Sequence, residues 1–129
     1  MTVTPPPANP YAATQQPMSP PDEKLWATLI HLSGLVFGIV GLPFLGALIG
    51  YLVLRERGPF VRWHTAQALN FQLTVLIGYV IGGVLAIVFI GFFVLIAVGI
   101  LSIVFAIIAA VAANRGEYYK YPLTIPFVQ

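Results

Sequence analysis

Two histidines, His31 and His64, are the side chains of this sequence best suited to chemistry. Paired imidazoles on neighbouring helices can ligate a metal ion or a haem iron. Two ligands make a sparse site, however, and the sequence has no cysteine and no carboxylate close to either histidine. We therefore expect no metal and no cofactor, and we interpret both as interfacial histidines. A haem- or quinone-binding membrane subunit that uses this pair is kept as a third functional hypothesis.

Enzyme chemistry has little support in the sequence. The two long apolar stretches, 25–54 and 73–113, contain no Asp, Glu, Lys or Arg, which excludes a paired-carboxylate site within them. Ser33 has no base at a suitable spacing, and Ser102 stands among apolar residues. We expect no catalytic residue and no enzymatic activity.

Polar side chains instead repeat at helical spacing on two segments. Lys24, Thr28 and His31 fall at i, i+4 and i+7, and Trp63, Gln67, Asn70 and Thr74 fall at i, i+4, i+7 and i+11. Two further polar residues lie off these lines, so the candidate polar face comprises Lys24, Thr28, His31, His64, Gln67, Asn70, Gln72 and Thr74.

Two interpretations of these polar faces are open. In the first, the faces meet in a dry contact between helices, in which each hydrogen bond contributes about 0.6 kcal/mol. In the second, they line a wet groove or half-channel that opens to the cytoplasm. We favour the dry contact. Gln72 points nearly opposite to Asn70 and needs a partner of its own.

The amino-acid composition indicates the environment of these polar faces. Charged residues make up 8% of the 129 residues, where a soluble domain carries roughly 25%, and hydrophobic residues make up 59%. The mean hydropathy is +0.92. We therefore expect an integral membrane protein whose first partner is the lipid bilayer. The six basic residues are spread along the chain and form no stripe for a phosphate backbone, so we expect no nucleic-acid partner.

Length and helix breakers divide the apolar stretches. The first stretch contains Gly41-Leu42-Pro43, and the second has Gly91 near its middle, with Gly82-Gly83 as a competing break. The sequence predicts helices over 22–41, 43–57, 61–90 and 92–114, which form an all-α, four-helix membrane bundle of two hairpins. The alternative has three spans, with 25–54 as a single kinked helix.

The predicted domains follow from this division. Residues 1–21 hold seven of the eleven prolines and are expected to form a disordered cytoplasmic tail. Residues 22–117 form the four-span domain, and 118–129, rich in tyrosine, form an interfacial tail. With four spans, all six basic residues lie on one side. The positive-inside rule then puts both termini in the cytoplasm of a multi-pass protein of the bacterial inner membrane.

Small residues recur at the spacing that lets membrane helices approach closely. Three glycine pairs are separated by four positions, and they are Gly34 and Gly38, Gly46 and Gly50, and Gly78 and Gly82. We expect them to pack helices within the bundle; association between copies of the chain is the alternative.

Three segments resemble a known family. These are KLWATLIHLSG at 24–34, PFVRWHTAQALNFQ at 59–72 and ANRGEYYKYPLTIPFV at 113–128. They resemble small bacterial membrane proteins of unknown function related to the chloroplast inner-envelope protein import component. The pattern residues are His64, Ala68, Leu69, Asn70, Phe71, Gln72, Gly116, Glu117, Tyr119, Tyr121 and Pro122. The resemblance implies a four-helix membrane domain, and protein conduction only by analogy.

The sequence therefore predicts a small polytopic membrane protein without catalytic activity. We expect it to be an accessory or assembly subunit that acts through other membrane proteins or through copies of itself. The alternative is an oligomeric pore or protein-translocation component lined by the polar faces.

Overall fold

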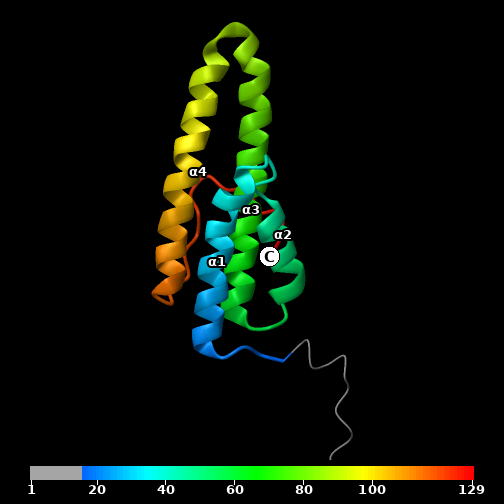
Figure 1. Ribbon diagram of the computed structural model, residues 1–129, viewed down its shortest axis with the longest axis vertical. Helices are drawn as coiled ribbons and strands as arrows, with labels where there is room; N and C mark the ends of the chain where they lie inside the picture. Colours follow the sequence, from blue (N-terminus) through cyan, green and yellow to red (C-terminus); the bar gives the residue numbers. More distant parts are fainter. Residues whose placement is uncertain (1–15) are drawn as a thin grey trace, which may run out of the picture.

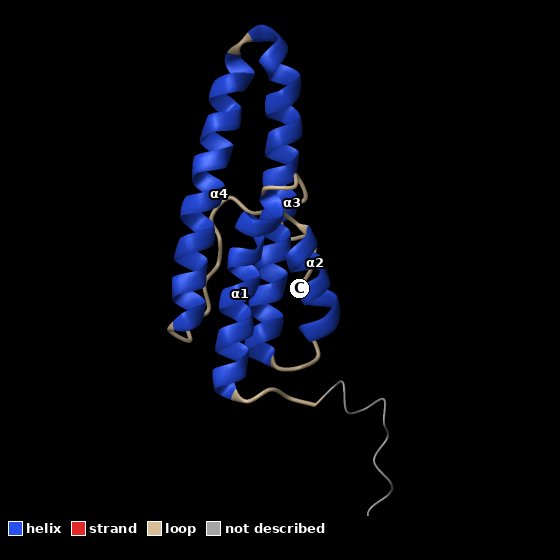
Figure 2. Ribbon diagram, in the orientation of Figure 1, coloured by secondary structure: helices blue, strands red, loops and turns tan. Residues whose placement is uncertain are grey.

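The computed structural model describes residues 16–129, so most of the predicted proline-rich tail lies outside the described residues. It contains four α-helices and a short 3-10 turn: α1 (Pro20–Gly38), α2 (Leu45–Leu54), α3 (Pro59–Leu85), η2 (Ala86–Val88) and α4 (Ile90–Asn114). The described part of the chain has no strand (Figure 2). The prediction of an all-α membrane bundle of two hairpins is confirmed.

Helix α1 begins two residues earlier than predicted because its first turn is well capped. The hydroxyl of Ser19 accepts a hydrogen bond from the backbone N–H of Asp22 at 3.4 Å. Two prolines occupy the first helical positions, and two acidic residues complement the positive end of the helix dipole.

The chain reverses direction between α1 and α2. Gly41 adopts a φ of +78°, a left-handed conformation that favours glycine, and the N–H of Leu42 donates to the carbonyl of Phe37 at 3.1 Å. Residues 25–54 therefore form two separate helices, and the alternative of a single kinked helix is wrong. The reversal uses more residues than predicted, so α2 has only 10 residues, about 15 Å.

The second reversal, between α3 and α4, depends on Gly91. A Cβ atom at this position would overlap the backbone nitrogen of Ala86, the carbonyl oxygen of Gly82 and the carbonyl carbon of Leu85. Only glycine allows the two backbones to approach this closely.

The two hairpins differ in reach. The α3–α4 hairpin extends well beyond the α1–α2 hairpin, which packs against its lower half (Figure 1). By length and composition, α3 with η2 (mean hydropathy 2.2) and α4 (3.1) can each cross a bilayer, whereas α2 is a shorter apolar helix. The main core lies in the lower half, and its buried residues are Ile30, Ala47, Tyr51, Leu54, Val61, Ala66, Ala68 and Leu69.

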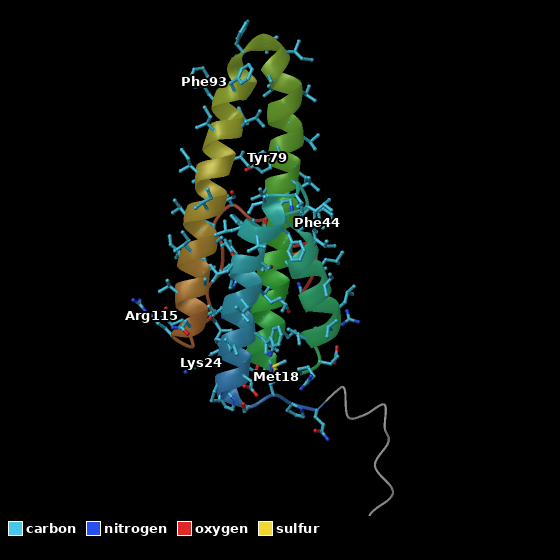
Figure 3. The ribbon with its side chains drawn as sticks, viewed as in Figure 1. Met18, Lys24, Phe44, Tyr79, Phe93 and Arg115 are labelled. Carbon is cyan, nitrogen blue, oxygen red and sulfur yellow. The ribbon has the colours of Figure 1, made fainter. Side chains whose placement is uncertain are left out.

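Charged residues occupy only one end of the molecule. They lie in the first turns of α1 and α3 and in the segments that follow α2 and α4. Lys24 and Arg115 mark this end in Figure 3. One carboxylate there joins two helices, because the Glu23 side chain accepts a hydrogen bond from the N–H of Val61 at 2.9 Å at the start of α3.

The paired glycines lie mostly at contacts between helices of the same chain. A Cβ atom at Gly34 would overlap Gln72, one at Gly46 would meet Ser33, and one at Gly50 would overlap Ile30. On the longer hairpin, a Cβ atom at Gly78 would lie 3.0 Å from Val98, and one at Gly82 would lie 2.7 Å from Leu95. Gly38 is exposed and has only Pro43 near it.

Two adjacent glycines provide a matched test of this packing. Gly82→Ala is expected to lower the free energy of unfolding by about 1 to 3 kcal/mol, because the new methyl group must displace Leu95. A Cβ atom added at Gly83 would have no heavy atom of another segment within 4 Å, so Gly83→Ala should be neutral or stabilise by up to about 1 kcal/mol. Unfolding of both variants in mixed micelles measures the difference, and equal stabilities would contradict the close α3–α4 contact.

Candidate functional site

The C-terminal segment, 115–129, folds back along the bundle. It leaves the end of α4, runs beside that helix and crosses toward α3, so that the C-terminus lies near α2 (Figure 1). The indole N–H of Trp63 donates to the carbonyl of Tyr119 at 3.2 Å, and the hydroxyl of Tyr51 donates to the carbonyl of Gln129 at 2.8 Å. We call this segment the C-terminal strap.

The two histidines meet in the interior and join a hydrogen-bonded chain of four groups. His31 Nδ1 lies 2.7 Å from the Tyr121 hydroxyl, and His31 Nε2 lies 2.9 Å from His64 Nδ1. His64 Nε2 lies 2.8 Å from the carbonyl oxygen of Glu117. This series of hydrogen bonds therefore links α1 and α3 to the strap at two points, Glu117 and Tyr121.

The direction of these hydrogen bonds follows from the carbonyl group at one end. The carbonyl of Glu117 can only accept, so His64 Nε2 carries a proton and donates. With neutral rings, His64 Nδ1 accepts from His31 Nε2–H, and His31 Nδ1 accepts from the Tyr121 hydroxyl. Every ring nitrogen is then used, so neither histidine has a nitrogen available for haem iron.

The side chains in this series of hydrogen bonds are shielded from solvent. Both histidines are 0% exposed and Tyr121 is 2% exposed. The Tyr121 ring stacks on Phe71 with centroids 3.9 Å apart. Burial raises the pKa of the Tyr121 phenol well above its ordinary value, which keeps the hydroxyl protonated as the donor that the chain requires.

The polar face of α3 bonds to the strap. The Asn70 side chain donates from Nδ2 to the carbonyl of Val128 and accepts from the N–H of the same residue, both at 2.8 Å. Thr74 Oγ1 accepts from the N–H of Ile125 at 3.1 Å. An amide side chain that makes both bonds to one residue's backbone replaces the pairing that a strand partner would supply.

The other predicted polar residues lie elsewhere. The hydroxyl of Thr28 donates to the carbonyl of Lys24 at 2.7 Å within α1. Gln67 lies in a surface groove beside Lys120 of the strap, and Gln72 lies against Gly34 of α1. Of the two predicted faces, the structure thus brings together only His31 and His64.

Sequence reasoning missed the part played by the strap. Tyr121, Val128 and the carbonyl of Glu117 complete the site, although the tail was expected to lie at the interface. The available signal was the polar face of α3, which is longer than the polar face of α1 and therefore needs a second partner. Within 16–129, no group of three or more histidine or acidic side chains could hold a metal ion.

Comparison with known proteins identifies a family for the chain. No curated protein and no solved structure matches the chain. Residues 22–128 match the model of the MamF/MmsF family, the magnetosome magnetite crystal formation protein family. The expected membership of a family related to the chloroplast import component was therefore wrong, because the segments that suggested it lie inside this matched range. The chain belongs to the magnetosome magnetite crystal formation protein family.

Proposed function

We propose that the chain is a non-catalytic accessory or assembly subunit of a membrane in which magnetite crystals form, and that it acts through other membrane proteins. The observation that carries this proposal is the closure of its polar faces. His31, His64 and Asn70 bond to one another or to the strap, so these side chains are not available to partners, and the helix surfaces away from the charged end are largely apolar.

One such surface is the upper part of the α3–α4 hairpin. It rises beyond α1 and α2 (Figure 1), and its side chains are exposed in the isolated chain. The large exposed residues near its tip are Val80, Ile81, Val84, Ile87, Val88, Phe89, Ile90, Phe92 and Phe93. In a bilayer, this surface contacts lipid or the helices of neighbouring proteins.

Crystal formation is tested by complementation. The chain is expressed in a magnetite-forming bacterium that lacks its own member of this family, and crystal sizes are measured by electron microscopy. We expect larger crystals than in the uncomplemented strain. An unrelated multi-pass protein expressed at the same level serves as the control, and crystals unchanged by the expressed and folded wild-type chain would contradict the proposal.

Action through other membrane proteins is tested by affinity purification from gently solubilised membranes of the same strain. Specific membrane proteins should copurify with the chain and not with an unrelated multi-pass protein of similar size. Recovery of the chain alone would count against an accessory role. The pore alternative gains no support from Asn70 and Thr74, because both bond to the strap.

For orientation, we propose that both termini face the cytoplasm of a bacterial membrane. All ten charged residues lie toward the end of the molecule at which α1 and α3 begin and α2 and α4 end, and six of them are basic. Because α1 and α2 form a hairpin, the chain returns to this charged end after α2, even though α2 is short.

The absence of cysteine from the sequence makes the orientation easy to test. Ser19→Cys and Lys120→Cys should resist an impermeant maleimide in intact cells and react after permeabilisation. Labelling of Ser19→Cys in intact cells would contradict the proposed orientation.

A further inference from the structure

A cavity of about 660 Å³ lies between α1, α3 and α4, near the α1–α2 turn. This volume is within the range of about 300 to 1,000 Å³ that is typical of small-molecule sites. The residues on which the argument rests are Gly34, Gly38, Gln72, Tyr79, Gly99 and Ser102. Three of them are glycines, so no side chain from these positions fills the cavity.

The Gln72 amide lines this cavity without a partner from the protein. The residue is only 4% exposed, and its side chain makes no hydrogen bond to any residue of the described segment 16–129. Every fully enclosed polar side-chain atom of that segment has a hydrogen-bond partner. The Gln72 amide has none, so its atoms are not fully enclosed, and they face the cavity that the residue lines. An amide inside a membrane protein is costly unless something bonds to it, and this one is positioned for a ligand.

Two further polar groups share the cavity. Tyr79 follows Gln72 by seven positions on the same face of α3 and points toward α4 (Figure 3), where a Cβ atom at Gly99 would lie 3.4 Å from its hydroxyl. The Ser102 hydroxyl donates to the carbonyl of Gly99 at 2.8 Å and keeps its capacity to accept. No charged side chain of the described segment lines the cavity.

The depth of the cavity in the membrane determines which class of ligand it can bind. Gln72 lies nine residues beyond Trp63, or about 14 Å along α3 from the charged end. The charged headgroup of a phospholipid stays at the membrane surface, whereas a neutral head with carbonyl or hydroxyl oxygens can reach this depth. Ile39 and Ile103 at the rim are exposed, so an apolar tail can leave the cavity sideways into lipid.

We propose that this cavity binds the head of a quinone-type neutral lipid. A ring oxygen accepts from the Gln72 amide or the Tyr79 hydroxyl, and the prenyl tail passes out beside α1 and α4. Both groups can donate and accept, so the site suits the carbonyl oxygens of a quinone and the hydroxyls of a quinol. This site is separate from the His31–His64 pair, whose nitrogens are all bonded within the chain.

The test uses the full chain in phospholipid nanodiscs and decylubiquinone as the probe, with binding measured by calorimetry. We expect saturable binding that Gln72→Leu weakens about 3- to 10-fold and Tyr79→Phe about 3-fold. Gln67→Leu makes the same change on the same helix outside the cavity and should bind as the wild type does. Decylbenzene, which has no ring oxygens, should bind measurably more weakly.

A second measurement keeps the proposal testable if Gln72→Leu does not fold. A photoreactive azidoquinone is added to the unmodified chain, and the labelled peptides are identified by mass spectrometry. We expect labelling around 72–79 and 99–103. Absence of saturable binding, equal affinity for decylbenzene, a folded Gln72→Leu with wild-type affinity, or labelling confined to other segments would each overturn the proposal.

Discussion

His64→Leu is expected to lower the free energy of unfolding of the membrane domain by about 2 to 4 kcal/mol. The substitution removes two hydrogen bonds, leaves the Nε2–H of His31 without a partner in the interior and removes the donor to the carbonyl of Glu117. A buried polar group left unpaired costs about 1 to 3 kcal/mol, and bonds between membrane helices contribute somewhat less than this on average. Unfolding of the purified chain in mixed detergent micelles, followed by circular dichroism, measures the loss.

Trp63→Phe is the matched control for this substitution. It removes one hydrogen bond to the strap, at 3.2 Å, from the neighbouring residue, which is partly exposed. We expect a loss of about 1 kcal/mol or less. A His64→Leu protein as stable as Trp63→Phe would show that the buried chain of hydrogen bonds does not stabilise the fold.

Gly91→Ala is the second substitution with a large expected effect, at least about 3 kcal/mol or a failure to accumulate in the membrane. The added methyl group would overlap backbone atoms of Gly82, Leu85 and Ala86. A side chain can rotate away from such a contact, but a helical backbone cannot, so the reversal between α3 and α4 would have to open.

The control for this effect is Gly83→Ala in the same hairpin. Its added methyl group meets no heavy atom of another segment within 4 Å, so the stability should be unchanged or slightly higher. Normal accumulation and stability of Gly91→Ala would mean that the two helices do not approach as closely as described.

Much of the fold could be predicted from the sequence because lipid imposes strong rules on it. Uncharged stretches longer than one span must contain a break, and Gly41-Leu42-Pro43 and Gly91 supply residues that helices do not readily accommodate. The bounds were less predictable. We expected the second helix over 43–57, whereas α2 spans Leu45–Leu54, because turn geometry depends on φ and ψ angles that composition does not specify.

The candidate site was only partly predictable. Helical spacing placed Asn70 and Thr74 on one face, but the partner of that face is an extended segment more than 50 residues away in sequence. Contacts from a side chain to a distant backbone have no periodicity, so no pattern in the strap indicated them. The direct hydrogen bond between His31 and His64 could not be predicted for a related reason. Helical periodicity shows which residues share a face of one helix, but it does not show which residues of two helices meet.

The C-terminal strap closes the polar face of α3, and hydrogen exchange of the strap measures this closure. The full chain in nanodiscs is exchanged into deuterated buffer, and a C-terminal peptide is followed by mass spectrometry. We predict slow exchange at Ile125 and Val128, whose N–H groups donate to Thr74 and Asn70, and selective loss of protection in Asn70→Leu. Exchange of these amides in the wild-type chain as fast as in an unstructured peptide would show that the strap does not bond to α3.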